Sequence, residues 1–354
     1  MPPSTAAPNP VAPAQPPPRV GMFRILISYW YYKHLDLEAL MARVFQRPYP
    51  PMFADSGAFS AMTQGVSIAL GDYAQWLLTY KHLFQVYSNL DVIRHPLLTW
   101  NNQERLEGDY GLTPLPVFHV ATPWTWLEHY LDRYRYVALG VAGHPYRTYM
   151  GWLVRCFQAA QGRAVYHGFG ITAWEPWRQF PWFSVDSSSW GQGFRYGQVP
   201  VFLPHRGKFG KFGVGKRREV YQYAPAIREL GFDPEDFADR ARNRRGLLCA
   251  LAAMSYMQAE VYLRKRHGPI TIPGSPGADE GVTLYLAEAS SDMRDTASVA
   301  AYLQHTGPQV YLADGAQGMD NVHLARQGVR AWLDGADPGT ADLKRGKERR
   351  HAPA

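Results

Sequence analysis

The stretch Phe53-Ala-Asp55-Ser-Gly57-Ala-Phe59 and its counterpart Phe183-Ser-Val-Asp186-Ser-Ser-Ser-Trp190 decide how this chain is expected to fold. In each stretch a short apolar run ends in an aspartate, and small, turn-forming residues follow. The strands of a parallel barrel end in this way and deliver a side chain to the carboxyl-terminal mouth. We therefore expect Asp55 and Asp186 to share one site.

Short β-rich runs recur on both sides of these stretches, and segments with apolar residues at helical spacing, such as Tyr73–Tyr87, separate them. Strand and helix alternating in this way predict an α/β fold, a (β/α)8 TIM barrel with a helical C-terminal extension. The predicted strands are Phe23–Ser28, Met52–Asp55, Leu90–Ile93, Leu115–Val120, Tyr136–Gly140, Ala164–His167, Trp182–Asp186 and Val199–Leu203.

Four regions are expected along the 354 residues. They are a disordered Pro- and Ala-rich arm over residues 1–20, the barrel over 21–215, a helical or mixed extension over 216–334 and a disordered basic tail over 335–354. Within the extension we expect helices at about 216–230 and 234–267, a strand over Val282–Ala287 and a helix over Ala297–Gln304. The sequence assigns no role to the part after residue 267.

The bulk composition is that of a globular protein with a polyanionic partner. It is 46% hydrophobic and 14% aromatic, and the formal net charge is +7. The two cysteines, Cys156 and Cys249, are too few for a disulfide framework or for a thiolate zinc site of the usual ligand count. The first residues lack the pattern of a signal peptide, and no apolar run approaches the roughly 20 residues that cross a bilayer. A soluble, cytoplasmic protein without membrane contact is expected.

Two carboxylates at strand ends suit two kinds of chemistry. They can act as nucleophile and proton handler at a sugar carbon, or they can be paired metal ligands. His119 and His167 also fall at predicted strand ends, which keeps a His/Asp metal site open as the less favoured alternative. A third alternative is that each aspartate only caps a turn or a helix start.

Glycine-rich turns favour the sugar chemistry. Leu139-Gly-Val-Ala-Gly143 and His167-Gly-Phe-Gly170 each follow a predicted strand, where glycine lets the backbone approach a flat ligand. Phe59, four residues after Asp55, offers an aromatic face on which a base can stack. Each of these features is weak evidence when it is taken alone.

Taken in order, these motifs are similar to those of the tRNA-guanine transglycosylase superfamily, whose barrel exchanges guanine for a 7-deazaguanine. The resemblance covers residues 22–205, and its specificity lies in the ordered set. The Asp-Ser-Ser-Ser-Trp form and the short chain without a zinc site look closest to the DNA-modifying branch, the DpdA-type transglycosylases of phages and some bacteria. The motifs are Asp55-Ser-Gly-Ala-Phe59, Gly140-Val-Ala142, His167-Gly-Phe-Gly170 and Val185-Asp186-Ser187.

The resemblance implies a role for each matched residue. Asp186 would attack the sugar C1′ and form a covalent glycosyl-enzyme, and Asp55 would transfer protons on the leaving or entering base. This agrees with the residue-based interpretation, because exchange with retained configuration needs two displacements. The remaining matched residues would contact the base: Phe59 by stacking, Gly140 and Val141 through their backbone, His167 with Gly168 on the other face, and His119 through a polar contact.

The chain departs from the family in two respects. The family's base-reading aspartate on the third strand has two candidate equivalents, Asp91 and His95, and the sequence does not decide between them. The zinc site of the tRNA enzymes cannot be built from two cysteines, so we expect no metal and no cofactor.

A basic and aromatic stretch, His205–Arg218, follows the last predicted barrel strand. It contains six Lys or Arg and no acid, interleaved with Phe209 and Phe212, and it predicts a flexible loop that holds a nucleic-acid backbone. The alternative is an ordinary solvated loop. The candidate nucleic-acid-binding residues are Arg195, Arg206, Lys208, Lys211, Lys216, Arg217 and Arg218.

The function expected from these features is the replacement of guanine in DNA by a 7-deazaguanine derivative. The partners would be DNA and a free 7-deazaguanine base, and an accessory protein that opens the duplex is a further candidate, because a paired base must be flipped out before its C1′ is accessible. The alternatives are the same exchange on tRNA, a non-catalytic nucleic-acid-binding paralogue, and a barrel glycosidase that acts on sugars.

Overall fold

The computed structural model of the protein describes residues 23–45, 48–141, 143–275, 282–288 and 293–306. The predicted arm over residues 1–20 and the predicted tail over 335–354 lie outside these ranges. The chain divides into two compact units: residues 1–190, 204–209 and 256–291 form the first, and 191–203, 210–255 and 292–354 form the second. This division differs from the single boundary expected at residue 215, because the chain returns to the first unit after visiting the second.

The first unit is built on an eight-stranded sheet in the order β3-β2-β1-β10-β7-β6-β5-β4, and every neighbouring pair is parallel. The sheet is curled, and one isolated parallel bridge between Ser88 and Leu115 links the segments beside the outermost strands β3 and β4. An α/β fold with a parallel sheet is therefore confirmed. The strands are β1 (Ile25–Ser28), β2 (Met52–Asp55), β3 (Phe84–Tyr87), β4 (Val117–His119), β5 (Tyr136–Gly140), β6 (Val165–Phe169), β7 (Ser184–Ser187) and β10 (Thr283–Ala287).

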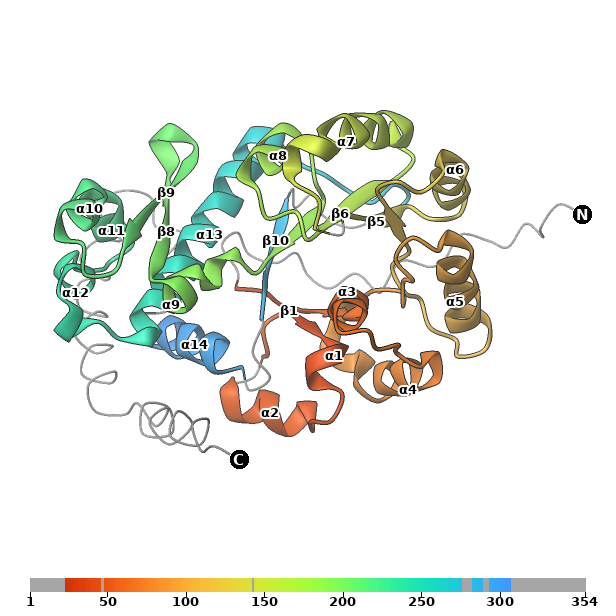
Figure 1. Cartoon of the computed structure of the whole chain (residues 1–354), viewed down its shortest axis with the longest axis horizontal. Helices are drawn as coiled ribbons and strands as arrows, with labels where there is room; N and C mark the ends of the chain where they lie inside the picture. The colour runs from red at the N-terminus through yellow and green to blue at the C-terminus, as the bar shows by residue number, and fades with distance from the viewer. Residues whose placement is uncertain (1–22, 46–47, 142, 276–281, 289–292, 307–354) are drawn as a thin grey trace, which may run out of the picture. The chain divides into compact units, whose positions relative to one another are not determined.

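Helices connect successive strands and cover the outside of this sheet (Figure 1). In α7, for example, Tyr149, Leu153, Cys156 and Ala160 recur at helical spacing and are all buried, so one face of the helix packs on the protein. The helices and short 3-10 turn of this part are α1 (Tyr29–Tyr32), α2 (Leu37–Val44), α3 (Ala58–Thr63), α4 (Leu70–Tyr80), η1 (Lys81–Leu83), α5 (Pro96–Gly108), α6 (Trp124–Arg133), α7 (Tyr146–Ala160) and α8 (Trp174–Gln179).

Two of the eight predicted strands are wrongly assigned to the barrel. The third strand is Phe84–Tyr87 and not Leu90–Ile93, because helix α4 ends at Tyr80 and η1 leads the chain into the sheet six residues earlier than predicted. The eighth strand is β10, from the segment to which the sequence assigned no role. The run Val199–Leu203 belongs instead to a separate two-stranded sheet.

One face of the eight-stranded sheet encloses a shared apolar cluster. Its members come from strands at both ends of the strand order, including Val117 of β4 and Phe53 of β2, and Val86 of β3 packs against it. Because side chains alternate between the two faces of a strand, the residue two positions after each member also points to this inner face. The inner face therefore continues from the apolar cluster into the strand ends.

The second unit contains most of a β-hairpin and several helices. Its apolar core includes Phe212, Val220, Ile227 and Phe237. Its elements are η2 (Ser189–Gly191) at the boundary, α9 (Gln192–Tyr196), β8 (Gln198–Leu203), α10 (Arg217–Gln222), α11 (Ala224–Glu229), α12 (Glu235–Ala238), η4 (Arg240–Arg242) and α14 (Arg294–Thr306). The boundary between the units falls within the hairpin strand β9 (Lys208–Gly213) and within α13 (Arg245–His267).

The flexible basic loop predicted over His205–Arg218 is wrong as a secondary-structure prediction. The turn η3 (Pro204–Arg206) closes a hairpin, and β9 pairs with β8. Phe212 is wholly buried in the core of the second unit, while Phe209 packs against Trp174 and Tyr256 in the first. These two aromatic residues hold the strand in place, so they are not free to stack on a base.

Helix α13 is the one helix among the described residues that has the length and composition to cross a membrane. Within its most apolar window, 72% of the residues are buried inside the protein. A mostly buried helix of this kind is typical of the core of a soluble protein.

Candidate active site

The candidate site forms where the inner face of the sheet reaches the carboxyl ends of the strands. Asp55 lies two residues after the core residue Phe53, and Asp186 lies two residues after the inward-facing Ser184. Parallel register places Ser28 beside Asp55 and Tyr285 beside Asp186. Both predicted carboxyl groups are thus brought to one end of one sheet.

Asp55 has an environment that favours its protonated form. The pKa of Asp55 is raised to about 7, mainly by burial and further by the neighbouring carboxyl groups of Asp91 and Asp186. Hydrogen bonds from the Gly57 amide and the Ser28 hydroxyl act in the opposite direction. The Gly57 N–H donates to Asp55 Oδ2 at 3.0 Å. Gly57 has a φ of 76°, and a Cβ there would lie 2.4 Å from Ser28 Oγ, so only glycine allows this turn.

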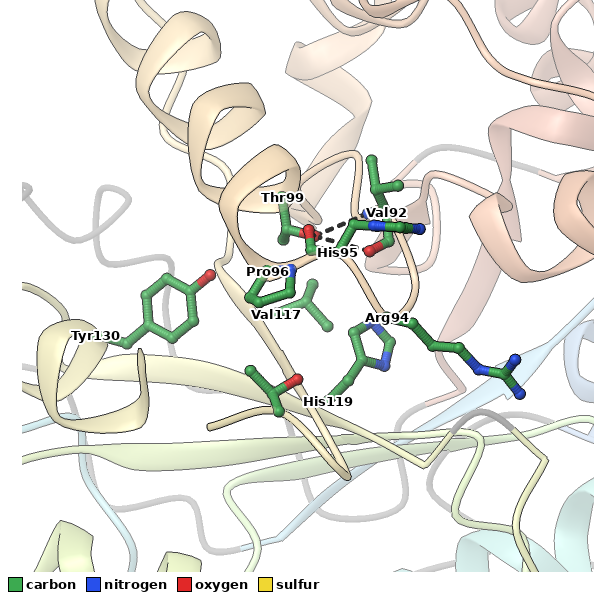
Figure 2. A pocket seen from close by; sticks show the side chains of 9 residues that line it. Val92, Arg94, His95, Pro96, Thr99, Val117, His119 and Tyr130 are labelled. Atoms are coloured by element: carbon green, nitrogen blue, oxygen red, sulfur yellow. Dashed lines mark hydrogen bonds between the residues drawn. The ribbon is translucent and has the colours of Figure 1, made fainter. Parts of the chain in front are cut away.

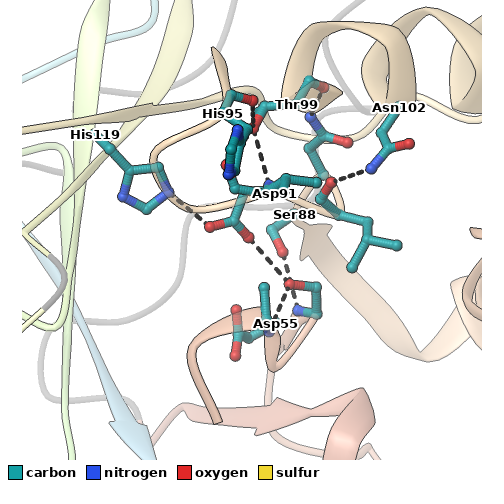
Figure 3. A network of polar contacts seen from close by, with 12 residues as sticks. Asp55, Ser88, Asp91, His95, Thr99, Asn102 and His119 are labelled. Carbon is teal, nitrogen blue, oxygen red and sulfur yellow. Dashed lines mark hydrogen bonds and ion pairs between the residues drawn. The ribbon is translucent and has the colours of Figure 1, made fainter. Parts of the chain in front are cut away.

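Asp91 and His119 form a buried pair beside Asp55 (Figure 3). Asp91 Oδ2 lies 2.6 Å from His119 Nε2, and the two side chains are 11% and 10% exposed. Ser56, the residue after Asp55, donates its hydroxyl to Asp91 Oδ1 at 3.2 Å, and its own N–H donates to Ser88 Oγ. Asp91 is therefore held at both carboxylate oxygens and tied to the Asp55 turn.

The observed position of β3 distinguishes between Asp91 and His95, the two candidates for the base-reading residue of the third strand. Asp91 follows the strand by four residues and joins Asp55 and His119, whereas His95 precedes α5 as its N-cap residue and its side chain is exposed. His95 lines a small pocket with His119, Arg94 and Tyr130 (Figure 2). The structure thus brings Asp91 into the carboxylate site and leaves His95 at its margin.

Asp186 is buried at the end of β7, with its side chain 11% exposed. Its Oδ1 accepts a hydrogen bond of 3.2 Å from the Gly170 N–H in the turn after β6. The second carboxylate oxygen has no hydrogen bond to a described residue in this structure. One oxygen of Asp186 is oriented by the backbone, and the other remains for a ligand.

His167 lies directly behind Asp186 and is completely buried. Its Nδ1 is 2.6 Å from Ser184 Oγ, which is 2.5 Å from the Tyr136 hydroxyl, and its Nε2 is 3.6 Å from Asp186 Oδ1. Burial lowers the pKa of His167, and the nearby Asp186 only partly offsets that shift, so the ring is neutral near pH 7. Phe53 and Phe169 pack on the ring, at centroid distances of 4.6 and 4.4 Å.

The other predicted base-contacting residues lie around this site in different environments. Phe59 is 46% exposed on α3, next to the loop that follows β5. Gly140 packs against the His119 ring, since a Cβ there would lie 2.4 Å from Nδ1, and the carbonyls of Gly140 and Val141 accept backbone hydrogen bonds from Val120 and His144. Gly168 packs on the other side of the sheet, against Trp182.

The predicted nucleic-acid-binding cations are exposed, but they are divided between the two units. Arg206 and Lys208 belong to the first unit, and the others, Arg195, Lys211, Lys216, Arg217 and Arg218, belong to the second. Lys216 and Arg217 form ion pairs with Glu219 and Glu235 within the second unit. These cations therefore do not belong to one loop.

The side chains at the site suit proton and covalent chemistry. Among the described residues no group of three or more His, Cys, Asp or Glu has the geometry of a metal site. Three carboxyl groups converge instead, of which Asp55 has a pKa raised to about 7 and Asp186 has one oxygen without a hydrogen bond to a described residue. Such an arrangement provides a general acid and a carboxylate nucleophile side by side.

Three contributors to the site were missed in the sequence. Ser184 was open to prediction, because it lies two residues before Asp186 and so shares its strand face. Tyr136 and Ser56 carry no comparable signal, since their hydrogen-bond partners come from other strands.

Comparison with protein-family models finds no match for this chain, and comparison with curated proteins finds none either.

Proposed function

We propose that the protein is a base-exchange transglycosylase that replaces guanine in DNA with a 7-deazaguanine derivative. The observation that carries the proposal is the pairing of Asp55, whose pKa is raised to about 7, with the buried Asp186 at the same end of one parallel sheet. Exchange of one base for another with retained configuration requires a proton-carrying group and a carboxylate that can hold the sugar between two displacements.

In this mechanism Asp186 attacks C1′ of the target deoxyguanosine. The C1′–N9 bond breaks, its electron pair stays with guanine, and the proton of Asp55 neutralises the departing base. The incoming 7-deazaguanine then transfers its N9 proton to Asp55, and its nitrogen attacks C1′ and releases Asp186. The Gly170 N–H, which donates to Asp186 Oδ1, keeps the carboxylate in position through both steps.

Asp91 and His119 are proposed to contact the base. Their buried pair lies beside Asp55 and presents a polar edge at the depth where a base would reach Asp186. Phe59 is proposed to stack on the base from the exposed rim. Because His167 is packed between Phe53 and Phe169, we assign it to Asp186 rather than to a face of the base.

The finer fold proposal is a (β/α)8 barrel whose eighth strand is β10. The shared inner cluster and the parallel bridge between Ser88 and Leu115 support it, because both link the two ends of the strand order. The barrel would be the site of exchange in the cytoplasm, with no bound metal or cofactor.

The proposal is tested by incubating the protein with guanine-containing single-stranded DNA, or in a parallel reaction with tRNA, and a 7-deazaguanine base that bears a cyano or aminomethyl group. The nucleic acid is digested to nucleosides, and the modified nucleoside is sought by mass. We expect product with DNA from the wild type and from Asp109→Asn, a surface control, and none from Asp186→Ala. Product on tRNA alone would favour the tRNA alternative, and DNA binding without product on either substrate would favour the non-catalytic paralogue.

A further inference from the structure

The loops at the carboxyl ends of the strands have an unusual charge distribution. After β1, β2, β4 and β5, and after Asp91 in the segment that follows β3, residues 29–35, 56–71, 92–103, 120–127 and 141–154 contain no Asp or Glu. The first acids along each of the first four segments come later, on the outer helices, at Asp36, Asp72, Glu104 and Glu128. Among the described residues, Asp55, Asp91 and Asp186 of the site lie at or after the ends of β2, β3 and β7, and the buried Glu288 follows β10.

The same segments contain cations that lie beside aromatic rings. Lys33 Nζ lies 4.1 Å from the centroid of the Trp30 ring. Arg147 is exposed and donates its Nε–H to the Tyr146 hydroxyl at 3.3 Å. Each pair combines a charge that can meet a phosphate with a ring on which a base can stack.

Arg94 is a cation at the margin of the carboxylate site. It has a φ of 69°, a backbone conformation that arginine rarely adopts, and its exposed side chain makes no hydrogen bond or ion pair with any described residue. It lines the pocket that also contains His119 (Figure 2). A strained backbone that holds an unpaired cation beside a pocket is typical of a ligand-binding position.

The Trp30–Lys33 pair and the Tyr146–Arg147 pair are joined by a path across the loops. The Tyr31 hydroxyl donates to Ser60 Oγ at 3.3 Å, which joins α1 to α3. Phe59 of α3 reaches the loop after β5, where a Cβ on Gly143 would lie 3.5 Å from its ring. The path therefore runs from the Trp30–Lys33 pair through Phe59 to the Tyr146–Arg147 pair.

We propose that this path, formed by Trp30, Lys33, Phe59, Tyr146 and Arg147, is together with Arg94 at the pocket a binding track for single-stranded polynucleotide. The choice of a polynucleotide rests on the proposed function, and the exposed rings favour single strands because stacked duplex bases offer no free faces. The track lies on the same loops that surround Asp55 and Asp186, so an extruded nucleotide can enter the site while its neighbours stay on the track. It differs from the β9 hairpin, on which the sequence placed the nucleic-acid contacts.

The test is equilibrium binding of a labelled single-stranded oligodeoxynucleotide of about 12 nucleotides, measured by fluorescence anisotropy without any 7-deazaguanine base. The double variant Arg94→Glu/Arg147→Glu is compared with Arg43→Glu/Lys81→Glu, which makes the same charge change on α2 and η1, away from the loops of the track. We expect the first to weaken binding at least about 10-fold and to reduce the salt slope by about two, and the control to change Kd less than about twofold.

A second variant separates stacking from charge. Phe59→Ala is expected to weaken binding about fivefold, as loss of one stacked base does, with an unchanged salt slope. Equal losses in the two charge-reversal variants would overturn the track, as would a larger loss in Lys208→Glu/Lys211→Glu on the hairpin. Equal affinity for single-stranded and duplex DNA would overturn its single-strand character. Intact binding without base exchange would refute the proposed function and leave the track supported.

Discussion

The two ends of the eight-stranded sheet use charge in opposite ways. At the amino end, Glu260 of α13 lies 3.0 Å from Arg24 Nη1 and 3.2 Å from Arg264, and it accepts the Leu284 N–H. Arg24 and Glu260 are almost completely buried, so each charge is matched within the protein. At the carboxyl end, three carboxyl groups converge and the buried His167 beside them is neutral.

This difference shows which charges serve the fold and which serve the site. The amino-end cluster is a matched network in which removing one member leaves a buried charge without its partner. At the carboxyl-end cluster, burial and then the excess negative charge raise the pKa of Asp55, which makes ionisation of that group unfavourable for folding. Charges that lower stability yet lie together in a site are expected to have a function.

The largest expected effect comes from Asp186→Ala. It removes the proposed nucleophile, so exchange should fall by at least about 10⁴-fold, while the melting temperature stays equal or rises because one of three converging acids is lost. Nucleoside mass analysis and thermal unfolding measure the two quantities. A variant that retains wild-type exchange would exclude Asp186 as the nucleophile.

The opposite result is expected at the other end of the sheet. Glu260→Gln leaves Arg24 buried without its carboxylate, and we expect the free energy of unfolding to fall by about 3–5 kcal/mol. Urea denaturation measures the change. The control is Glu38→Gln, which breaks an exposed pair with His82 and should change stability by less than about 1 kcal/mol. A similarly small loss for Glu260→Gln would show that the buried charges at the amino end of the sheet do not depend on one another for stability.

The stability of the carboxyl end of the sheet should depend on pH through Asp55. Because its pKa is raised from 3.8 to about 7 on folding, the folded state binds a proton that the unfolded state has released, so stability contributed by this group falls as pH rises from about 4 to 7. Asp55→Asn cannot ionise and keeps an oxygen for the Gly57 N–H. We expect it to be more stable than the wild type by about 4 kcal/mol at pH 8 and equal to it at pH 4.

The same variant should change the pH dependence of exchange. The wild-type rate should decline above pH 7 as Asp55 loses its proton, and Asp55→Asn should be slow at every pH because it has no proton to donate. Denaturation at several pH values and exchange rates over the same range test both effects. A stability difference that is independent of pH would show that Asp55 is ionised in the folded protein.

The two central aspartates could be predicted from the sequence because their signal is local. An apolar run that ends in Asp and a turn encodes both the strand and the direction of the side chain, and β2 has the predicted bounds. Ser184 follows from the same logic. The amino-end cluster could not be predicted, since Arg24 and Glu260 are 236 residues apart and nothing near either one indicates the other.

The misplaced strands have a physical cause as well. Apolar residues at helical spacing continue from α4 into Phe84–Tyr87, so periodicity alone does not show where the helix stops. Strand β10 enters the sheet between β1 and β7 about 90 residues after the second unit begins, and pairing over that separation depends on tertiary packing. The Asp91–His119 pair could not be predicted from the sequence, because the position of Asp91 depends on where β3 ends.

The smallest expected effect concerns the hydrogen-bonded chain behind Asp186. One arrangement satisfies its groups: Tyr136 donates to Ser184, Ser184 donates to His167 Nδ1, and the Nε2–H faces Asp186 Oδ1 at 3.6 Å. Tyr136→Phe removes the first donor and leaves the ring in place. We expect exchange to fall about threefold and the Nε2–H tautomer of His167, read from its ¹⁵N chemical shifts, to lose population.

Tyr166→Phe is the matched control for this prediction. Tyr166 is another buried tyrosine of the same sheet, but its hydroxyl donates to the Cys156 carbonyl of α7 and contacts neither His167 nor Ser184. Both variants should lose about 1 kcal/mol of stability with the hydrogen bond, and only Tyr136→Phe should alter exchange and the His167 tautomer. If the two variants changed exchange equally, the chain behind Asp186 would belong with the amino-end cluster, as a group of contacts that serves the fold alone.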